Sequence, residues 1–161
     1  MLDEMFAMMK TDMPHVTWEC YELNEEKLRD KKFVFDFLNY FPGALGLAVI
    51  GEPVVHKFKM SDKKPGDGVT GIVILAESHL AVHTWPETRY AVIDLFSCKI
   101  FDIGKADRLL RQFFGPGRYK KDLVYRGEEL IKSGTEIINS RMRQLQQSQP
   151  TGRPMALNSK A

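Results

Sequence analysis

The strongest constraint on the fold is an apolar, strand-like stretch that a polar triplet interrupts. Residues 69–76 (VTGIVILA) are typical of a central strand, and the strand pattern resumes at residues 80–83. Between them stand Glu77, Ser78 and His79. Polar residues inside a core strand break the local pattern, and such breaks concentrate at functional sites. A polar sheet edge or a bend would also explain the triplet.

The rest of the sequence alternates strand and helix patterns. Further strands are expected at residues 15–23, 44–50, 53–58, 90–96 and 119–125. Helices are expected from Glu25 to just before Pro42, at 104–114 and at 127–147, with a polar loop at 59–68 and a turn around Pro86. Hairpin-like strands with helices between them predict an α+β fold, an antiparallel sheet with helices packed on one face.

Length and composition limit the domain organisation and the partners. The 161 residues predict a loosely ordered lead-in (1–14), one domain (15–147) and a polar tail (148–161). A net charge of +2 argues against a nucleic-acid partner, and no apolar run is long enough to span a membrane. Two cysteines and no export signal favour the cytoplasm and free thiols.

The polar triplet belongs to a longer recognisable stretch. Residues 77–87 (ESHLAVHTWPE) are followed by DLFSC at 94–98. From residue 67 to 98 the chain resembles, without a gap, the self-processing region of the prokaryotic S-adenosylmethionine decarboxylase family. Residues 15–28 and 56–58 (HKF) are similar to other elements of that family. The resemblance covers about two-thirds of the chain and fades after Asp102.

The resemblance implies self-cleavage. In the family the hydroxyl that corresponds to Ser78 attacks the carbonyl of Glu77, and a histidine, here His83, removes the serine α-proton. Thr70 occupies the position of the family's processing-assisting serine. The products would be a β chain (residues 1–77) and an α chain (residues 78–161) that begins with a pyruvoyl group.

The same resemblance assigns the second reaction. The pyruvoyl group made from Ser78 would form a Schiff base with the substrate amine and accept the electrons left when carbon dioxide departs. Cys98 would then donate the proton. By resemblance Phe58 stacks on adenine and Glu87 binds the ribose hydroxyls. From its own chemistry, the aromatic face of Trp85 could line the pocket and meet a cationic sulfonium. Ordinary packing of the two aromatic residues, or solvation of the carboxylate, would also explain these residues.

The hairpin geometry supports part of this assignment. If Pro86 lies near the turn, Cys98 falls within a couple of positions of the residue opposite Ser78. Strand alternation, however, puts Ser78 and His83 on opposite faces, so a bulge or kink near the cleavage site is expected. His79 and His83 show no third ligand at a suitable spacing, so no metal is expected.

The leading hypothesis is an enzyme, a pyruvoyl-dependent carboxy-lyase that decarboxylates S-adenosylmethionine for spermidine biosynthesis. Because Lys99 stands where the family has glycine and Thr88-Arg89 replace an aromatic-glycine turn, a pyruvoyl-dependent ornithine or arginine decarboxylase is the alternative. An uncleaved, non-catalytic homologue is a third reading. The family also implies a homodimer of cleaved protomers, in which exposed sheet faces pair into a sandwich.

Overall fold

The computed structural model of the chain describes residues 13–61, 64–127, 136 and 140. Contacts between Cα atoms divide the chain into one unit up to Gly127 and a second from Glu128 onward, and the fold described below is that of the first unit. Most of the lead-in, most of the helix expected at residues 127–147 and the polar tail lie outside the described residues.

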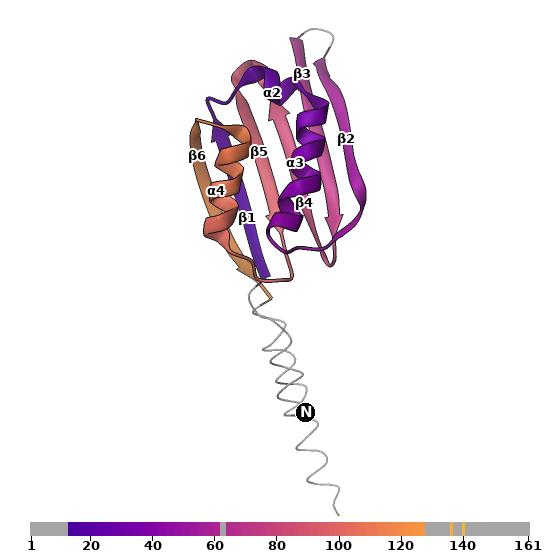
Figure 1. Cartoon of the computed structure of the whole chain (residues 1–161), viewed down its shortest axis with the longest axis vertical. Helices are drawn as coiled ribbons and strands as arrows, with labels where there is room; N and C mark the ends of the chain where they lie inside the picture. Colours follow the sequence, from indigo (N-terminus) through magenta and orange to yellow (C-terminus); the bar gives the residue numbers. More distant parts are fainter. Residues whose placement is uncertain (1–12, 62–63, 128–135, 137–139, 141–161) are drawn as a thin grey trace, which may run out of the picture. The chain divides into compact units, whose positions relative to one another are not determined.

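Six strands form one sheet in the order β2-β3-β4-β5-β1-β6, and every neighbouring pair is antiparallel (Figure 1). The strands are β1 (Met13–Tyr21), β2 (Val49–Ser61), β3 (Lys64–Leu75), β4 (Ser78–Trp85), β5 (Tyr90–Phe96) and β6 (Arg118–Arg126). β3, β4 and β5 form a meander at the centre of the first unit, with the polar triplet at the β3–β4 turn.

Three helices cover one face of this sheet: α2 (Glu25–Arg29), α3 (Lys31–Ala44) and α4 (Ile103–Phe114) (Figure 1). Each begins after a side-chain cap, because Asn24, Asp30 and Asp102 accept backbone N–H groups of the first turn. A short 3-10 helix, η1 (Pro86–Thr88), joins β4 to β5. The α+β fold with helices on one face is therefore confirmed.

The core lies between the helices and the sheet. Alternate residues of each central strand point into it, as in β1, where Val16, Trp18 and Cys20 are buried. Gly71 lets α3 approach the sheet, because a Cβ at this position would lie 2.6 Å from the side chain of Leu38. The other sheet face, called the open face here, carries no helix from the described part of the chain.

Three expectations about element boundaries were wrong. The helix expected from Glu25 to Pro42 is two helices that meet at Asp30, and Pro42 lies inside the last turn of α3. The two strands expected on either side of Gly51 are one strand, because Gly51 adopts a φ of 72° within an irregularity of the β2–β3 register. That hairpin also reaches Ser61 paired with Lys64, so most of the expected loop at 59–68 is strand.

Candidate active site

The polar triplet lies at a tight, strained turn. Leu75 pairs with Ser78, so only Ala76 and Glu77 connect β3 to β4. Glu77 has a φ of 65°, the left-handed region that favours glycine. A non-glycine residue there costs on the order of 1–3 kcal/mol, and such strain concentrates at functional sites. The strained residue is the one whose carbonyl precedes Ser78.

Cys98 contacts both sides of the Glu77–Ser78 peptide bond. Its backbone N–H donates to Ser78 Oγ at 3.0 Å, and its thiol donates to the Glu77 carbonyl oxygen at 2.8 Å. In the β4–β5 register His79 pairs with Phe96. Continuing this register puts Ser97 opposite Ser78, and Cys98 is the next residue. The expectation that Cys98 falls near Ser78 is therefore confirmed.

The segment that carries Cys98 is held by its neighbours. Ser97 is buried; its hydroxyl donates to the Lys99 carbonyl at 2.7 Å and accepts the Lys99 N–H at 3.0 Å. The Lys99 ammonium reaches the carbonyl of Gly46 at 2.9 Å. The lysine that departs from the family pattern thus ties the Cys98 turn to the connection between α3 and β2.

Thr70 and His83 form a second group, away from Ser78. They are cross-strand partners of β3 and β4, and Thr70 Oγ1 lies 3.2 Å from His83 Nδ1. Both side chains are on the open face. Five strand positions separate Ser78 from His83, about 17 Å along β4.

The bulge expected between Ser78 and His83 is absent. The β3–β4 register runs without interruption from Leu75 opposite Ser78 to Thr70 opposite His83, and the β4–β5 register is equally regular from His79 to Trp85. A regular strand turns successive side chains to opposite faces, so residues five apart point away from each other. Within one chain, the structure therefore does not bring His83 to Ser78.

The expected substrate-binding residues lie beside His83. Phe58 pairs with Gly68 across β2 and β3. The Phe58 ring covers Gly68 so closely that a Cβ on Gly68 would lie 2.3 Å from Phe58 Cζ. Continuing the β3–β4 register places Trp85 opposite Gly68. The Trp85 ring centroid lies 6.4 Å from that of His83 and 5.3 Å from that of Tyr90.

Glu87 is tied to the same end of the sheet. Its Oε1 accepts the Arg29 guanidinium at 2.9 Å and the Asp67 backbone N–H at 3.1 Å. Desolvation disfavours its charged form, but the backbone N–H groups of Glu87 and Asp67, together with Arg29, outweigh it and hold the pKa of Glu87 below its usual value. Glu87 is thus an oriented carboxylate beside the segment that carries Gly68.

The sequence analysis did not single out a polar cluster near the cleavage turn. Asp94 on β5 accepts from His15 Nε2 at 2.9 Å and from His79 Nε2 at 3.1 Å. Only the alternation of β5 could have indicated it, because Asp94 falls on the open face between buried Ile93 and Leu95.

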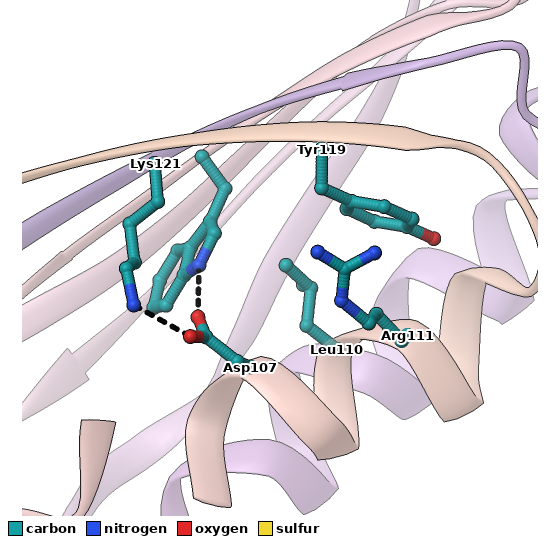
Figure 2. A pocket seen from close by; sticks show the side chains of 6 residues that line it. Asp107, Leu110, Arg111, Tyr119 and Lys121 are labelled. Atoms are coloured by element: carbon teal, nitrogen blue, oxygen red, sulfur yellow. Dashed lines mark hydrogen bonds and ion pairs between the residues drawn. The ribbon is translucent and has the colours of Figure 1, made fainter. Parts of the chain in front are cut away.

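A separate pocket lies between α4 and strands β1 and β6 (Figure 2). Asp107 of α4 accepts from the Trp18 indole and from Lys121, while the Arg111 guanidinium stacks on Tyr119. None of the site residues expected from the sequence lines this pocket.

Within the described part of the chain, no group of three or more His, Cys, Asp or Glu residues is arranged to hold a metal ion. No helix among the described residues is both long and apolar enough to cross a membrane.

Fold and site together define a class: an α+β protein in which a serine hydroxyl, the preceding backbone carbonyl and a thiol meet at a strained turn. Residues 14–127 match the family model described as S-adenosylmethionine decarboxylase. A protein of Syntrophomonas wolfei named S-adenosylmethionine decarboxylase proenzyme is 39% identical over 114 residues, covering 70% of this chain and 85% of that protein.

Another proenzyme of that name, from a Synechococcus species, is 36% identical over 84 residues, which cover 52% of this chain and 60% of that protein. The crystal structure of the adenosylmethionine decarboxylase from Aquifex aeolicus superposes with a TM-score of 0.56 at 27% identity, covering 73% of this chain and 92% of that one. The chain belongs to the S-adenosylmethionine decarboxylase family and is an enzyme of the carboxy-lyase class.

Proposed function

We propose that the chain cleaves itself between Glu77 and Ser78 and then decarboxylates S-adenosylmethionine with a pyruvoyl group made from Ser78. The observation that carries the proposal is the pair of contacts from Cys98 to Ser78 Oγ and to the Glu77 carbonyl, across a bond whose first residue has a φ of 65°.

The first step converts an amide into an ester. Ser78 Oγ attacks the carbonyl carbon of Glu77, the bond from that carbon to the Ser78 nitrogen breaks, and the nitrogen leaves as an amine. Negative charge develops on the Glu77 oxygen, where the Cys98 thiol donates. The left-handed strain at Glu77 is lost when the bond breaks, which favours the reaction.

The second step breaks the ester. A base removes the Ser78 α-proton, and the bond between Oγ and Cβ breaks, so that Glu77 leaves as the carboxylate end of residues 1–77. Addition of water and loss of ammonia then convert residue 78 into the pyruvoyl group. Histidine titrates in the right range for the base, and His83, oriented by Thr70, is our candidate.

The surroundings of residue 78 fit this group, because the backbone N–H of Cys98 lies beside residue 78 and loses its acceptor when Ser78 Oγ leaves with Glu77, so it is available to donate to a carbonyl oxygen of the new group. The pyruvoyl carbonyl supplies an attachment point for the substrate amine and a sink for the electrons released with carbon dioxide. The contact of the Cys98 thiol with the Glu77 carbonyl, next to residue 78, supports Cys98 as the group that returns the proton.

We infer that a second copy of the chain completes the site. Ser78 and Cys98 lie at one end of β4, whereas Thr70 and His83 lie at the other, on the open face. Two open faces packed with their β4 strands antiparallel bring the end of β4 that carries the Glu77–Ser78 turn of one copy towards His83 of the other. The face also carries exposed apolar residues, which favour pairing: Val54, Ile72 and Ile74.

The remote end of the pocket selects the substrate, because every candidate amino acid offers the same amine and carboxylate. Phe58 and Trp85 supply aromatic surface for an adenine, and the ionised Glu87 supplies an acceptor for ribose hydroxyls. A basic amino acid would instead need a carboxylate near its far end.

Two residues that depart from the family pattern, Arg89 and Lys99, make contacts with the backbone of the scaffold. The Arg89 guanidinium donates to the backbone carbonyls of Leu23 and Glu22, at 2.8 Å each, and Lys99 is held at Gly46. Both residues therefore serve the scaffold, which supports S-adenosylmethionine over ornithine or arginine. A cytoplasmic location and a role in spermidine biosynthesis accompany this proposal.

The test is intact mass under denaturing conditions, followed by carbon dioxide release from S-adenosylmethionine, ornithine and arginine. We expect two chains, residues 1–77 and a pyruvoyl-bearing 78–161, and turnover of S-adenosylmethionine. Ser78→Ala should stay full-length. A wild-type chain that remains full-length after long incubation contradicts self-processing and supports the non-catalytic homologue, whereas cleaved protein that prefers ornithine or arginine contradicts only the substrate.

Phe58→Ala and Glu87→Gln test the pocket assignment in the cleaved enzyme. Each is expected to lower kcat/KM for S-adenosylmethionine by about 10-fold or more, because a stacking surface or a charged acceptor is lost. Unchanged kcat/KM in both variants removes these residues from the substrate pocket.

A further inference from the structure

The cluster on the open face next to the cleavage turn joins three strands through one carboxylate. His15 of β1 and His79 of β4 both lie opposite Phe96 of β5, one on each side. Asp94 lies two positions before Phe96 on β5. Its carboxylate accepts hydrogen bonds from His15 Nε2, at 2.9 and 3.0 Å, and from His79 Nε2, at 3.1 Å. In these contacts the carboxylate oxygens of Asp94 accept, and both imidazoles donate from Nε2.

The ring of Phe96 supports the same two histidines. Its centroid lies 5.8 Å from that of His15 and 6.0 Å from that of His79, and the Arg126 guanidinium covers it at 5.0 Å. The Asp94 side chain is only 30% exposed. The orientation of His79 is therefore fixed by a hydrogen bond and by ring packing.

After self-cleavage this cluster lies next to the new chain end. His79 follows Ser78 directly, so after cleavage it is the second residue of the new chain, whose first residue carries the pyruvoyl group. Chain ends fray unless they are tied down, and cutting the turn removes the covalent link that holds Ser78 opposite Leu75. His15 lies on the 1–77 product and Asp94 on the 78–161 product, so the cluster also links the two products.

We propose that Asp94, held by His15, is a positioning residue that anchors His79 and thereby keeps the reactive group at residue 78 in place after cleavage. This proposal rests on the proposed function. Misplacement of a reacting group by about 1 Å can reduce turnover by about 100-fold. Loss of the anchor is therefore expected to lower kcat, while self-cleavage, which occurs with the turn intact, continues.

The experiment compares cleaved wild-type enzyme with Asp94→Ala, Asp94→Asn and His79→Phe. His79→Phe keeps a ring against Phe96 and removes only the hydrogen bond, so it tests the anchor even if Asp94→Ala does not fold. Glu19→Ala is the matched control, because Glu19 is another carboxylate of the open face with several donors but lies beside Tyr21, Tyr90 and Lys120.

Three readouts are taken: the extent of cleavage by mass, kcat and KM for S-adenosylmethionine, and amide hydrogen exchange in residues 79–82. In Asp94→Ala and His79→Phe we expect full cleavage, a kcat lowered about 10- to 100-fold with KM changed less than 3-fold, and exchange at least 10-fold faster. Asp94→Asn, which keeps an acceptor oxygen, should recover most of the lost kcat. Glu19→Ala should leave exchange in residues 79–82 at the wild-type rate.

Wild-type kcat and exchange in fully cleaved His79→Phe would overturn the anchor while leaving the proposed function intact. The anchor would also be overturned if kcat is as low in Asp94→Asn as in Asp94→Ala. The same holds if Glu19→Ala shows both the lowered kcat and the faster amide exchange in residues 79–82. Wild-type protein that never cleaves would instead contradict the proposed function itself.

Discussion

At the scale of single residues, backbone strain is concentrated at three non-glycine positions of the described chain: Glu22, Glu77 and Arg89 have positive φ angles. The Arg89 side chain reaches back to the Glu22 carbonyl, so these two residues stabilise one another. The Glu77 carbonyl instead accepts the Cys98 thiol, and the peptide bond that follows Glu77 is the one that we expect to break.

Replacing the strained residue should therefore slow processing. Glu77→Gly removes the strain of the left-handed conformation, which amounts to ~1–3 kcal/mol for a non-glycine residue. Because part of this strain energy should lower the barrier to cleavage, the variant is expected to cleave itself about 10-fold more slowly. Time courses of cleavage on denaturing gels measure this. Glu22→Gly, at a φ of 62°, is the matched control and should cleave at the wild-type rate. Equal rates for the two variants would show that strain at Glu77 does not drive the reaction.

The thiol of Cys98 contacts the carbonyl that is attacked, so its removal should affect both reactions unequally. Cys98→Ala is expected to yield both chains, more slowly than wild type, and to lose most turnover because the proton donor is gone. Cleavage kinetics and carbon dioxide release on the same preparation measure the two effects. Wild-type turnover in fully cleaved Cys98→Ala would remove the thiol from the mechanism.

The buried thiol of Cys20 should make stability depend on pH. Burial raises the pKa of Cys20 from 9.0 to about 12, although nearby Arg111 opposes the shift. The unfolded chain therefore loses this proton before the folded chain does, and the stabilisation, complete below pH 9, is lost as the pH rises towards 12. In that window Cys20 should contribute a decline in unfolding free energy of about 1.4 kcal/mol per pH unit.

Urea unfolding between pH 9 and 11 in wild type and in Cys20→Ala measures this contribution. The variant should show a shallower decline, and equal slopes would contradict the assignment. Some decline remains in the variant, because desolvation and then the neighbouring Cys20 raise the pKa of Tyr119 to about 12 as well.

Most of the site residues that the sequence predicted are those that the family resemblance assigns. Ser78, Glu77 and Cys98 stand in a recognisable stretch, and the structure places them in contact. The roles assigned to His83 and to the pocket residues stay predictions. Asp94 stands in the same stretch, but no role was assigned to it, because one acidic residue in an alternating strand is usually solvated and its partners come from two other strands.

At the scale of secondary-structure elements, α4 is joined to the sheet by Asp107, which accepts from the Trp18 indole of β1 at 2.8 Å and from Lys121 of β6 (Figure 2). Asp107→Ala leaves the largely buried indole N–H without its partner and should lower the unfolding free energy by about 1–3 kcal/mol. Lys121→Ala, the control, removes only a partly exposed ion pair and should cost less than about 1 kcal/mol. Urea titrations measure both; equal losses would contradict a dominant indole bond.

The elements that the sequence predicted well are those with an uninterrupted period. The strand at 90–96 has the expected bounds, and α4 begins within one residue of its predicted start. The break between α2 and α3 was missed because it depends on the cap at Asp30, inside a continuous helical pattern. The single β2 strand was missed because glycine usually ends a strand, whereas Gly51 here forms an irregularity within one.

At the scale of the whole molecule, the expected fold is present but the expected site is divided. Strand alternation predicted opposite faces for Ser78 and His83, and the regular register of β4 confirms that prediction. A bulge or kink in β4 would have brought Ser78 and His83 together within one chain. The family resemblance implied a homodimer, but no local pattern indicates which residues of one copy approach the site of the other, so the proposed sharing of the site could not be predicted.

The proposal that two copies share the site predicts a result that only an assembly of two chains can give. Co-expressed Ser78→Ala and His83→Ala chains each lack one half, so either chain alone should remain full-length. In a randomly mixed two-fold dimer, one site combines Ser78 of the His83→Ala chain with His83 of its partner, and about half of the His83→Ala chains should therefore be cleaved. Mass spectrometry distinguishes the fragments. Cleavage of His83→Ala alone would show that His83 is not the base, and no cleavage in the mixture would show that the two halves do not meet across a dimer.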